Sequence, residues 1–141
     1  MRAAMALVMA TTLVLGGCSP APSARPVRTV TLGGEPWTVY VATGDGMRGL
    51  PGFGDVDGML FDLGRPVDPA GIAFTMEGIA YPIDIAWFDA EGALVSVASM
   101  VPCDAVPCPL YRAKGPYRWA VEAPVDGLAG VGPADRLVVE D

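Results

Sequence analysis

The sequence predicts an all-β domain: a compact β-sandwich or squat barrel of about eight short strands, mainly β with one or two short helical turns. Three observations predict it. The 18 glycines and 14 prolines among 141 residues separate short apolar runs, so few windows of about ten residues escape a helix breaker. These runs are apolar throughout or alternate with polar residues, as strands do. The composition is uniform, and the length suits one domain with one moderate core.

The expected strands follow one another along the chain, at residues 27–32, 37–41, 58–63, two or three within 71–100, then 117–122 and 136–140, with helical turns at 44–50 and 124–132. Gly33-Gly34 is typical of a two-residue hairpin turn. The densest apolar stretch, 71–100, is divided into a hairpin by a turn at Asp89–Gly92. Polarity alternates from Tyr117 to Glu122, which predicts a strand with one face in water.

The first residues, 1–17, have the pattern of a secretory signal peptide. Arg2 supplies one positive charge, and the thirteen uncharged residues after it are too few to span a bilayer. They end in Leu15-Gly16-Gly17-Cys18, which resembles the lipobox of bacterial lipoproteins. The resemblance implies cleavage before Cys18 and a diacylglyceryl group on its thiol. The alternative is an ordinary secretory leader with an incidental cysteine.

Residues 18–26 are expected to form the lipidated cysteine and a flexible tether, because proline, serine and alanine dominate them. Residues 27–141 are expected to form the single folded domain. Two or three acyl chains, at about 0.8 kcal/mol per buried methylene, make a lasting anchor that does not cross the membrane. The expected location is therefore extracytoplasmic, on the outer membrane of a Gram-negative source or otherwise on the outer face of the plasma membrane.

The composition excludes several classes of function. Sixteen acidic residues against nine basic ones give a net charge of −7, and loss of a leader with one arginine and no acid gives −8. This charge repels phosphate backbones, so no nucleic-acid partner is expected. The chain has no histidine, which excludes Ser-His-Asp and Cys-His nucleophiles and histidine-ligated zinc. We expect a monomer without cofactor or metal.

Cys103 and Cys108 enclose four residues in a loop bounded by prolines. In an exported chain, cysteines this close are expected to form a disulfide that fixes the loop after the central hairpin. Thioredoxin-like redox motifs use a two-residue spacing, and no further metal ligands lie nearby in the sequence. We therefore expect a structural role for this pair.

Asp84 lies between two isoleucines, so its carboxylate must find donors or take up a proton. It could orient a ligand or act as an acid. We favour a structural role, in which it accepts hydrogen bonds from loop amides or pairs with Arg48. Met76 and Met59 offer thioethers to copper, but without histidine or a free thiol a core role is expected. Asp84, Arg48 and Met76 form the candidate ligand or structural polar site.

The sequence has one cluster of aromatic and basic residues, which follows the cysteine loop. Its members are Tyr111, Arg112, Tyr117, Arg118 and Trp119. Such a cluster could stack on a sugar or pair with an acidic partner, because aromatic residues and arginine are enriched at interfaces. It could equally be the outer face of an edge strand.

Five short motifs follow one another in the chain: Arg48-Gly49-Leu50, Gly58-Met59-Leu60-Phe61, Phe74-Thr75-Met76, Pro82-Ile83-Asp84-Ile85 and Phe88-Asp89-x-x-Gly92. In this order they resemble an uncharacterised prokaryotic family, domain of unknown function 192 (DUF192), over about residues 27–139. The resemblance implies a compact β-rich fold and frequent export or lipid anchoring. It implies no established activity.

These features lead to one hypothesis and two alternatives for the function. The hypothesis is a membrane-anchored lipoprotein that binds an envelope component or a partner protein without catalysis. The first alternative is a hydrolase that uses paired carboxylates, such as Asp84 and Glu122, on glycan or peptidoglycan. The second is a structural envelope lipoprotein without a ligand.

Overall fold

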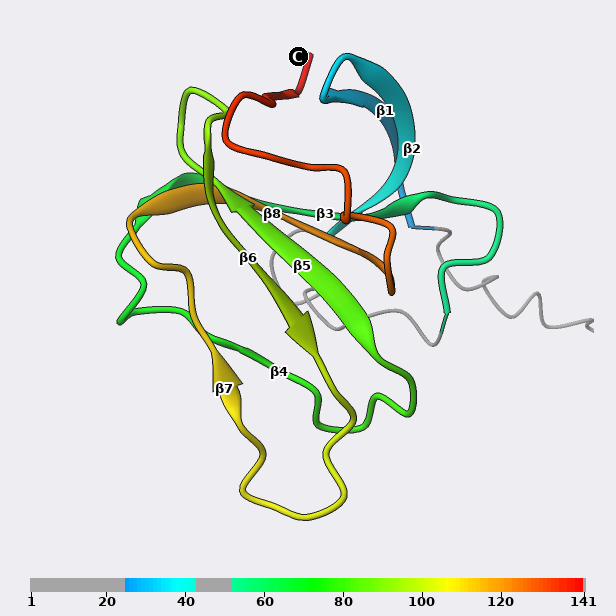
Figure 1. Cartoon of the computed structure of the whole chain (residues 1–141), viewed down its shortest axis with the longest axis vertical. Coiled ribbons are helices and arrows are strands. Elements are labelled where there is room, and N and C mark those ends of the chain that lie inside the picture. The colour runs from blue at the N-terminus through cyan, green and yellow to red at the C-terminus, as the bar shows by residue number, and fades with distance from the viewer. Residues whose placement is uncertain (1–24, 43–51, 141) are drawn as a thin grey trace, which may run out of the picture.

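The computed structural model describes residues 25–42 and 52–140, and within these ranges the chain forms strands and no helix (Figure 1). The strands are β1 (Val27–Leu32), β2 (Glu35–Ala42), β3 (Gly58–Val67), β4 (Phe74–Thr75), β5 (Ile83–Phe88), β6 (Leu94–Met100), β7 (Leu110–Tyr111), β8 (Tyr117–Pro124) and β9 (Leu137–Val138). Seven of them form one curled sheet, and β4 pairs with β7 in a second, smaller sheet. The predicted all-β class is confirmed.

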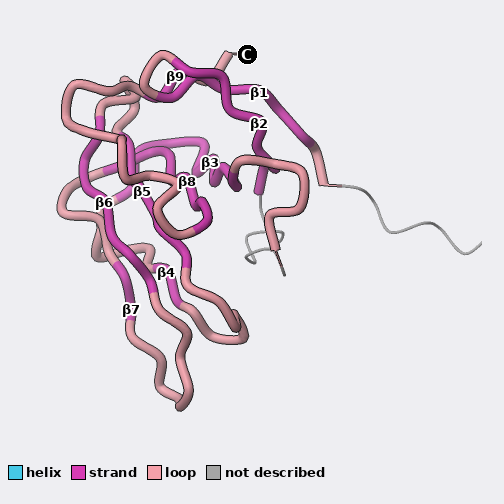
Figure 2. The backbone as a smooth tube through the Cα atoms, turned by 45° about the vertical axis from the view of Figure 1, so that its right-hand side comes forward, coloured by secondary structure: helices cyan, strands magenta, loops and turns pink. Residues whose placement is uncertain are grey.

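The large sheet curls into a half-barrel. Its order is β6-β5-β8-β3-β2-β1-β9, in which β2 and β3 are parallel and the other pairs are antiparallel. The chain beyond β8 returns across the open side, so that β9 pairs with β1 (Figure 2). Next to β9, Arg136 bridges Ala93, and the Leu137 amide donates to the Gly92 carbonyl at 2.9 Å. The C-terminal segment thus links the two far ends of the sheet.

Two cores lie on opposite faces of the central strands. The β4-side core is covered by the small sheet and contains Met59, Phe61, Phe74, Met76, Ile83, Ile85, Trp87, Met100, Tyr117 and Ala120, among others. The C-terminal core lies inside the curl and contains Val30, Leu32, Val39, Leu60, Ala86, Phe88, Trp119, Val121, Ala123, Leu128 and Leu137. Because side chains alternate along a strand, β5 sends odd-numbered residues to one core and even-numbered residues to the other.

The structure corrects two local expectations. The strand at Tyr117–Glu122 has no wet face, because β8 lies between β5 and β3 with a core on either side. The helical turn expected at 124–132 is a series of tight turns, with Gly127, Ala129 and Val131 amides donating three residues back. The helical turn expected at 44–50 lies outside the described residues.

Two residues that the sequence analysis assigns to the tether, Arg25 and Pro26, contact the folded domain. The Pro26 carbonyl accepts a hydrogen bond from the Val41 amide at 2.8 Å. Arg25 is partly buried, and its guanidinium lies 3.9 Å from the Sδ atom of Met59. The last two residues of the expected tether therefore pack on the domain, while the signal peptide and Cys18 lie outside the described residues.

Candidate functional site

Glu122 is a carboxylate in the middle of the sheet. On β8 it pairs with Met59 of β3 on one side and with Ile85 of β5 on the other. Paired residues share a face, so the Glu122 side chain lies with Met59 and Ile85 at the edge of the β4-side core. Its exposed fraction is 6%, and those of Met59 and Ile85 are 0%. A charged residue type is thus held in apolar surroundings.

The Glu122 carboxyl has no partner within residues 25–42 and 52–140, where it forms no hydrogen bond and no ion pair. Burial raises its pKa from the usual 4.5 to about 7, because the charged form loses its hydration. Tyr81, in the connection from β4 to β5, lies close enough to Glu122 for the charge of the carboxylate to act on its hydroxyl. Burial, and then the charge of Glu122, raise the pKa of the Tyr81 hydroxyl.

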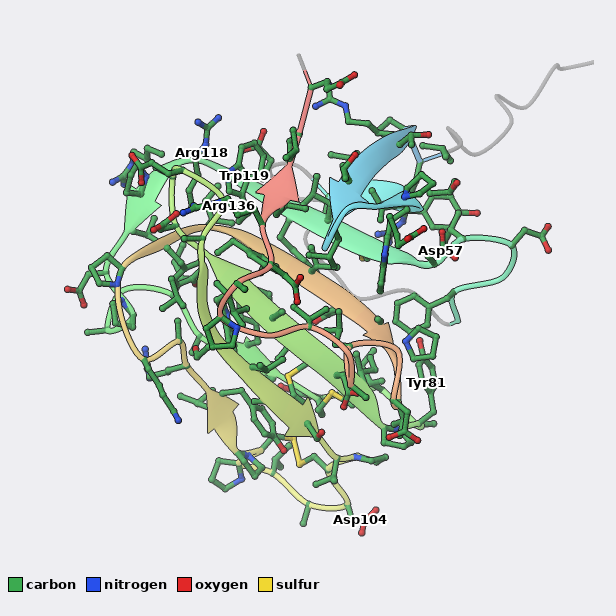
Figure 3. All side chains as sticks on the ribbon, turned by 45° about the horizontal axis from the view of Figure 1, so that its top comes forward. Asp57, Tyr81, Asp104, Arg118, Trp119 and Arg136 are labelled. Carbon is green, nitrogen blue, oxygen red and sulfur yellow. A yellow bond between two sulfur atoms is a disulfide. The ribbon has the colours of Figure 1, made fainter. Side chains whose placement is uncertain are left out.

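Aromatic rings surround this end of the sheet, where β5 begins and β8 ends. Tyr81 is partly exposed at the rim (Figure 3). The Phe53 ring packs edge-on against the Tyr81 ring, with centroids 6.3 Å apart and an interplanar angle of 75°. Tyr40 of β2 pairs with Met59 and packs against the same core. We call Glu122, Tyr81, Phe53, Tyr40 and Met59 the Glu122 site.

Asp84 lies on the opposite face of β5 and is satisfied within the fold. One carboxylate oxygen accepts the Ser99 hydroxyl at 2.6 Å, and the other accepts the Asp126 amide at 2.8 Å. The loop amide that the sequence analysis expected is therefore present, and it comes from the turn after β8. Arg48, its other expected partner, lies outside the described residues.

The expected polar site does not form as a unit. Met76 is buried in the β4-side core with an exposed fraction of 1%, whereas Asp84 faces away from that core. Met59 and Met100 are equally buried in the same cluster, as expected of core fillers. In the described part of the chain, no three histidine, cysteine, aspartate or glutamate side chains lie together as a metal site would need.

The geometry separates Asp84 and Glu122, the two carboxylates that the hydrolase alternative named. Asp84 pairs with Ala123 and Glu122 pairs with Ile85, one residue apart along each strand. Successive side chains point to opposite faces, so the sheet itself separates the two carboxyl groups. Glycosidase carboxylates must flank one bond from a shared cleft. Asp84 and Glu122 therefore cannot act as such a pair.

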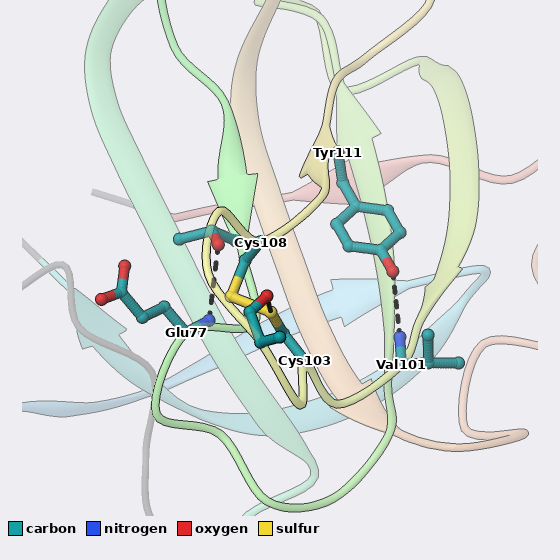
Figure 4. Close-up of a disulfide and its surroundings, with 7 residues drawn as sticks. Glu77, Val101, Cys103, Cys108 and Tyr111 are labelled. Carbon is teal, nitrogen blue, oxygen red and sulfur yellow. Dashed lines mark hydrogen bonds between the residues drawn. A yellow bond between two sulfur atoms is a disulfide. The ribbon is translucent and has the colours of Figure 1, made fainter.

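The predicted disulfide between Cys103 and Cys108 is confirmed. The sulfur atoms are 2.12 Å apart, and the Cα atoms are 5.6 Å apart (Figure 4). The bond closes the connection between β6 and β7, whose base is joined by a 3.1 Å hydrogen bond from the Val101 amide to the Tyr111 hydroxyl. The connection projects beyond the large sheet (Figure 1), and its residue Val106 is 75% exposed.

Removing the disulfide by Cys103→Ser with Cys108→Ser should lower the free energy of unfolding by about 2 kcal/mol, because a short ring restricts the unfolded chain modestly. Urea unfolding with and without a reductant measures this. The reductant should destabilise the parent protein by the same amount and leave the double variant unchanged. Equal stability of all four samples would contradict a stabilising role.

The expected aromatic and basic surface cluster is dispersed. Tyr117 and Trp119 are buried, in the β4-side and C-terminal cores respectively, so they are not surface residues. The Arg118 guanidinium lies 4.2 Å from the centroid of the Trp119 ring and 4.0 Å from Asp62. Arg112 is exposed, but its guanidinium donates to the Pro69 and Ala70 carbonyls at 2.8 and 3.0 Å. These contacts give both arginines structural roles.

Fold and site together define a class: a small half-barrel β domain with a buried carboxyl group, Glu122, at one end of its central strands. The chain belongs to the family DUF192, described as "Uncharacterized ACR", which it matches over residues 38–139. The family resemblance read from the sequence motifs is thereby confirmed. No curated protein matches the chain.

Two crystal structures have the same fold. One is a protein of Sinorhizobium meliloti 1021 for which a role as a transcription regulator has been suggested. It has a TM-score of 0.68 and 22% identity, with 83% of this chain and 96% of that chain covered. The other, of unknown function, is from Novosphingobium aromaticivorans DSM 12444. It has a TM-score of 0.68 and 22% identity, with 92% of this chain and 100% of that chain covered. At this identity the similarity concerns the fold alone.

Proposed function

We propose that this DUF192 protein is a lipid-anchored, extracytoplasmic binding module without catalytic activity, and that the Glu122 site is where it binds a ligand. The observation that carries the binding role is a carboxyl group buried in an apolar environment without a partner among the described residues. Such a group costs folding free energy, which is characteristic of residues retained for a function.

The extracytoplasmic location is supported by two independent features. The lipobox-like sequence ends at Cys18, and the Cys103–Cys108 disulfide is of the kind that persists in oxidising compartments. The described residues contain no helix long and apolar enough to cross a bilayer. A partner of the module would be an envelope component or another exported protein.

The absence of catalysis is part of the same proposal. The chain lacks histidine, and Asp84 and Glu122, the buried carboxylates of the described residues, lie on opposite faces of the sheet. The role suggested for the Sinorhizobium meliloti protein is not carried over, because the similarity is at the level of fold and the acidic net charge opposes binding to DNA.

The anchor is tested by Cys18→Ala. We expect this variant to move from the membrane fraction to the soluble fraction, because the thiol that would carry the lipid is gone. Cell fractionation with immunoblotting measures the shift. The variant with Cys103→Ser and Cys108→Ser is a matched control, since it loses two thiols but keeps Cys18, and it should stay in the membrane fraction. Retention of Cys18→Ala in membranes would refute the anchor.

A further inference from the structure

We infer that residues 101–110, which form the connection from β6 to β7 and the first residue of β7, dock on the surface of the lipid bilayer. We call them the disulfide loop. This inference rests on the lipid anchor of the proposed function and adds a second, non-covalent contact with the membrane. Four features carry it: the exposed surface of the loop, its bracing, the length of the tether, and the position of its one charge.

The exposed surface of the disulfide loop is almost entirely apolar. Among residues 25–42 and 52–140, the three most exposed large hydrophobic side chains all lie in this loop: Val106 at 75%, Leu110 at 60% and Val101 at 57%. Its other exposed residues are Asp104, Ala105, Pro107 and Pro109. Grouped apolar side chains in water mark contacts with a protein or a membrane, whereas scattered ones need no explanation. The loop therefore has the surface of a contact site.

The loop is braced, so these side chains are held away from the core. The Cys103–Cys108 disulfide closes it, and the Val101 amide donates to the Tyr111 hydroxyl at 3.1 Å. At its base, β7 pairs with β4, and Cys103 packs against the β4-side core. The loop extends from the end of the molecule opposite β9 (Figures 1 and 2). A surface that is already ordered loses little conformational entropy when it docks.

The proposed anchor keeps the bilayer within reach of this loop. Six residues separate Cys18 from Arg25, the first described residue, so an extended chain holds Arg25 within about 25 Å of the lipid. A domain of this size has a radius of gyration of about 13 Å, which allows it to turn its loop toward the membrane on such a tether. The effective concentration of the bilayer is then far above that of a free protein partner. The tether thus favours a membrane as the surface that the loop contacts.

Asp104 limits how deeply the loop docks. Its side chain is exposed and lies at the outer end of the loop (Figure 3). A carboxylate is costly in hydrocarbon, but among the headgroups it stays hydrated and lies beside the ammonium groups of zwitterionic lipids. The net charge of −7 likewise opposes an anionic membrane surface. The expected contact is therefore shallow and is made with a zwitterionic bilayer.

The test uses the full lipid-bearing chain in phosphatidylcholine vesicles, with and without bromine on the acyl chains close to the headgroup. Bromine quenches tryptophan fluorescence at short range. Val106→Trp should lose a larger share of its fluorescence to the brominated lipid than the parent, whose three tryptophans give the baseline. Val138→Trp is the matched control, because Val138 is also exposed, at 48%, but lies on β9. It should be quenched no more than the parent.

A second variant separates docking by the loop from the affinity of the added tryptophan for lipid. Adding Val101→Ser and Leu110→Ser to the Val106→Trp protein should lower the ratio of docked to free loops by about tenfold, because two aliphatic side chains no longer leave water. The quenching should fall accordingly. Both side chains are exposed, so the fold should be kept, and thermal unfolding checks this.

The inference would be overturned if Val106→Trp were quenched no more than Val138→Trp, which is also the outcome expected of a loop that contacts a protein instead. Quenching that persists unchanged in the serine variant would overturn it as well. Flotation of the same vesicles reports on the anchor alone. A protein that floats without quenching at the loop refutes only the docking, whereas a protein that does not float refutes the anchor and the docking with it.

Discussion

Replacing Gly92 by alanine is expected to lower the free energy of unfolding by about 4 kcal/mol, at the upper end of the range for single substitutions. Gly92 has φ +78°, a conformation that costs a residue with a side chain about 1–2 kcal/mol. In addition, a Cβ atom there would overlap the Leu137 carbonyl, which is backbone and cannot rotate away. Relief of the overlap would break the hydrogen bond from the Leu137 amide to the Gly92 carbonyl.

Gly34→Ala provides the matched control for this prediction. Gly34 also has positive φ, +85°, but a Cβ atom there would meet no atom within 4 Å. Its substitution should therefore lower the free energy of unfolding only by the cost of placing a side chain at positive φ, about 1 kcal/mol. Urea unfolding of both variants measures the difference, which isolates the contact between the β5–β6 turn and the C-terminal segment. Equal losses in the two variants would show that this contact contributes nothing.

Glu122→Gln is expected to stabilise the protein relative to the parent at high pH. The difference in free energy of unfolding between variant and parent should be about 3 kcal/mol larger at about pH 8.5 than at about pH 4. Burial raises the pKa of Glu122 from the usual 4.5 to about 7 in the folded state. At low pH both states hold the proton. As the pH rises from about 4.5 to 7, the unfolded chain releases it and the folded protein retains it, so stability falls through this range. Glutamine resembles the protonated carboxyl and removes this loss.

The measurement is urea unfolding of the parent and the variant across this pH range. Glu35→Gln is the control, because it removes an exposed carboxyl from the start of β2 with the same change in net charge. The two stability curves of parent and Glu122→Gln should diverge above about pH 5 and run parallel above about pH 7. Curves that stay parallel throughout would show that Glu122 ionises in the folded state as it does in the unfolded chain.

Local features of the fold could be predicted from the sequence because neighbouring residues determine them. The β1–β2 turn at Gly33-Gly34, with φ of +61° and +85°, follows from a residue type that tolerates this conformation. The Cys103–Cys108 disulfide follows from a separation of five residues. The strand β7 has two residues and carries no periodic signal, so no pattern in the sequence could have indicated it.

The candidate site could be predicted only in part, because it depends on which strands become neighbours. The alternation at Tyr117–Glu122 predicts an amphipathic strand, and Glu122 falls on its polar side. The order β5-β8-β3 places β8 at the centre of the sheet and covers that side. Likewise, Asp84 finds its amide donor at Asp126, 42 residues later, a separation over which sequence periodicity carries no information.

The pairing of β9 with β1 has a consequence for when this chain can fold. The hydrogen bonds between Thr31–Leu32 and Leu137–Val138 join segments from opposite ends of the described chain, so closure of the half-barrel waits until residue 138 has left the ribosome. Contacts this distant in sequence also form slowly. Under the export that we propose, such a delay would leave the chain open to passage through a secretion pore before the half-barrel closes.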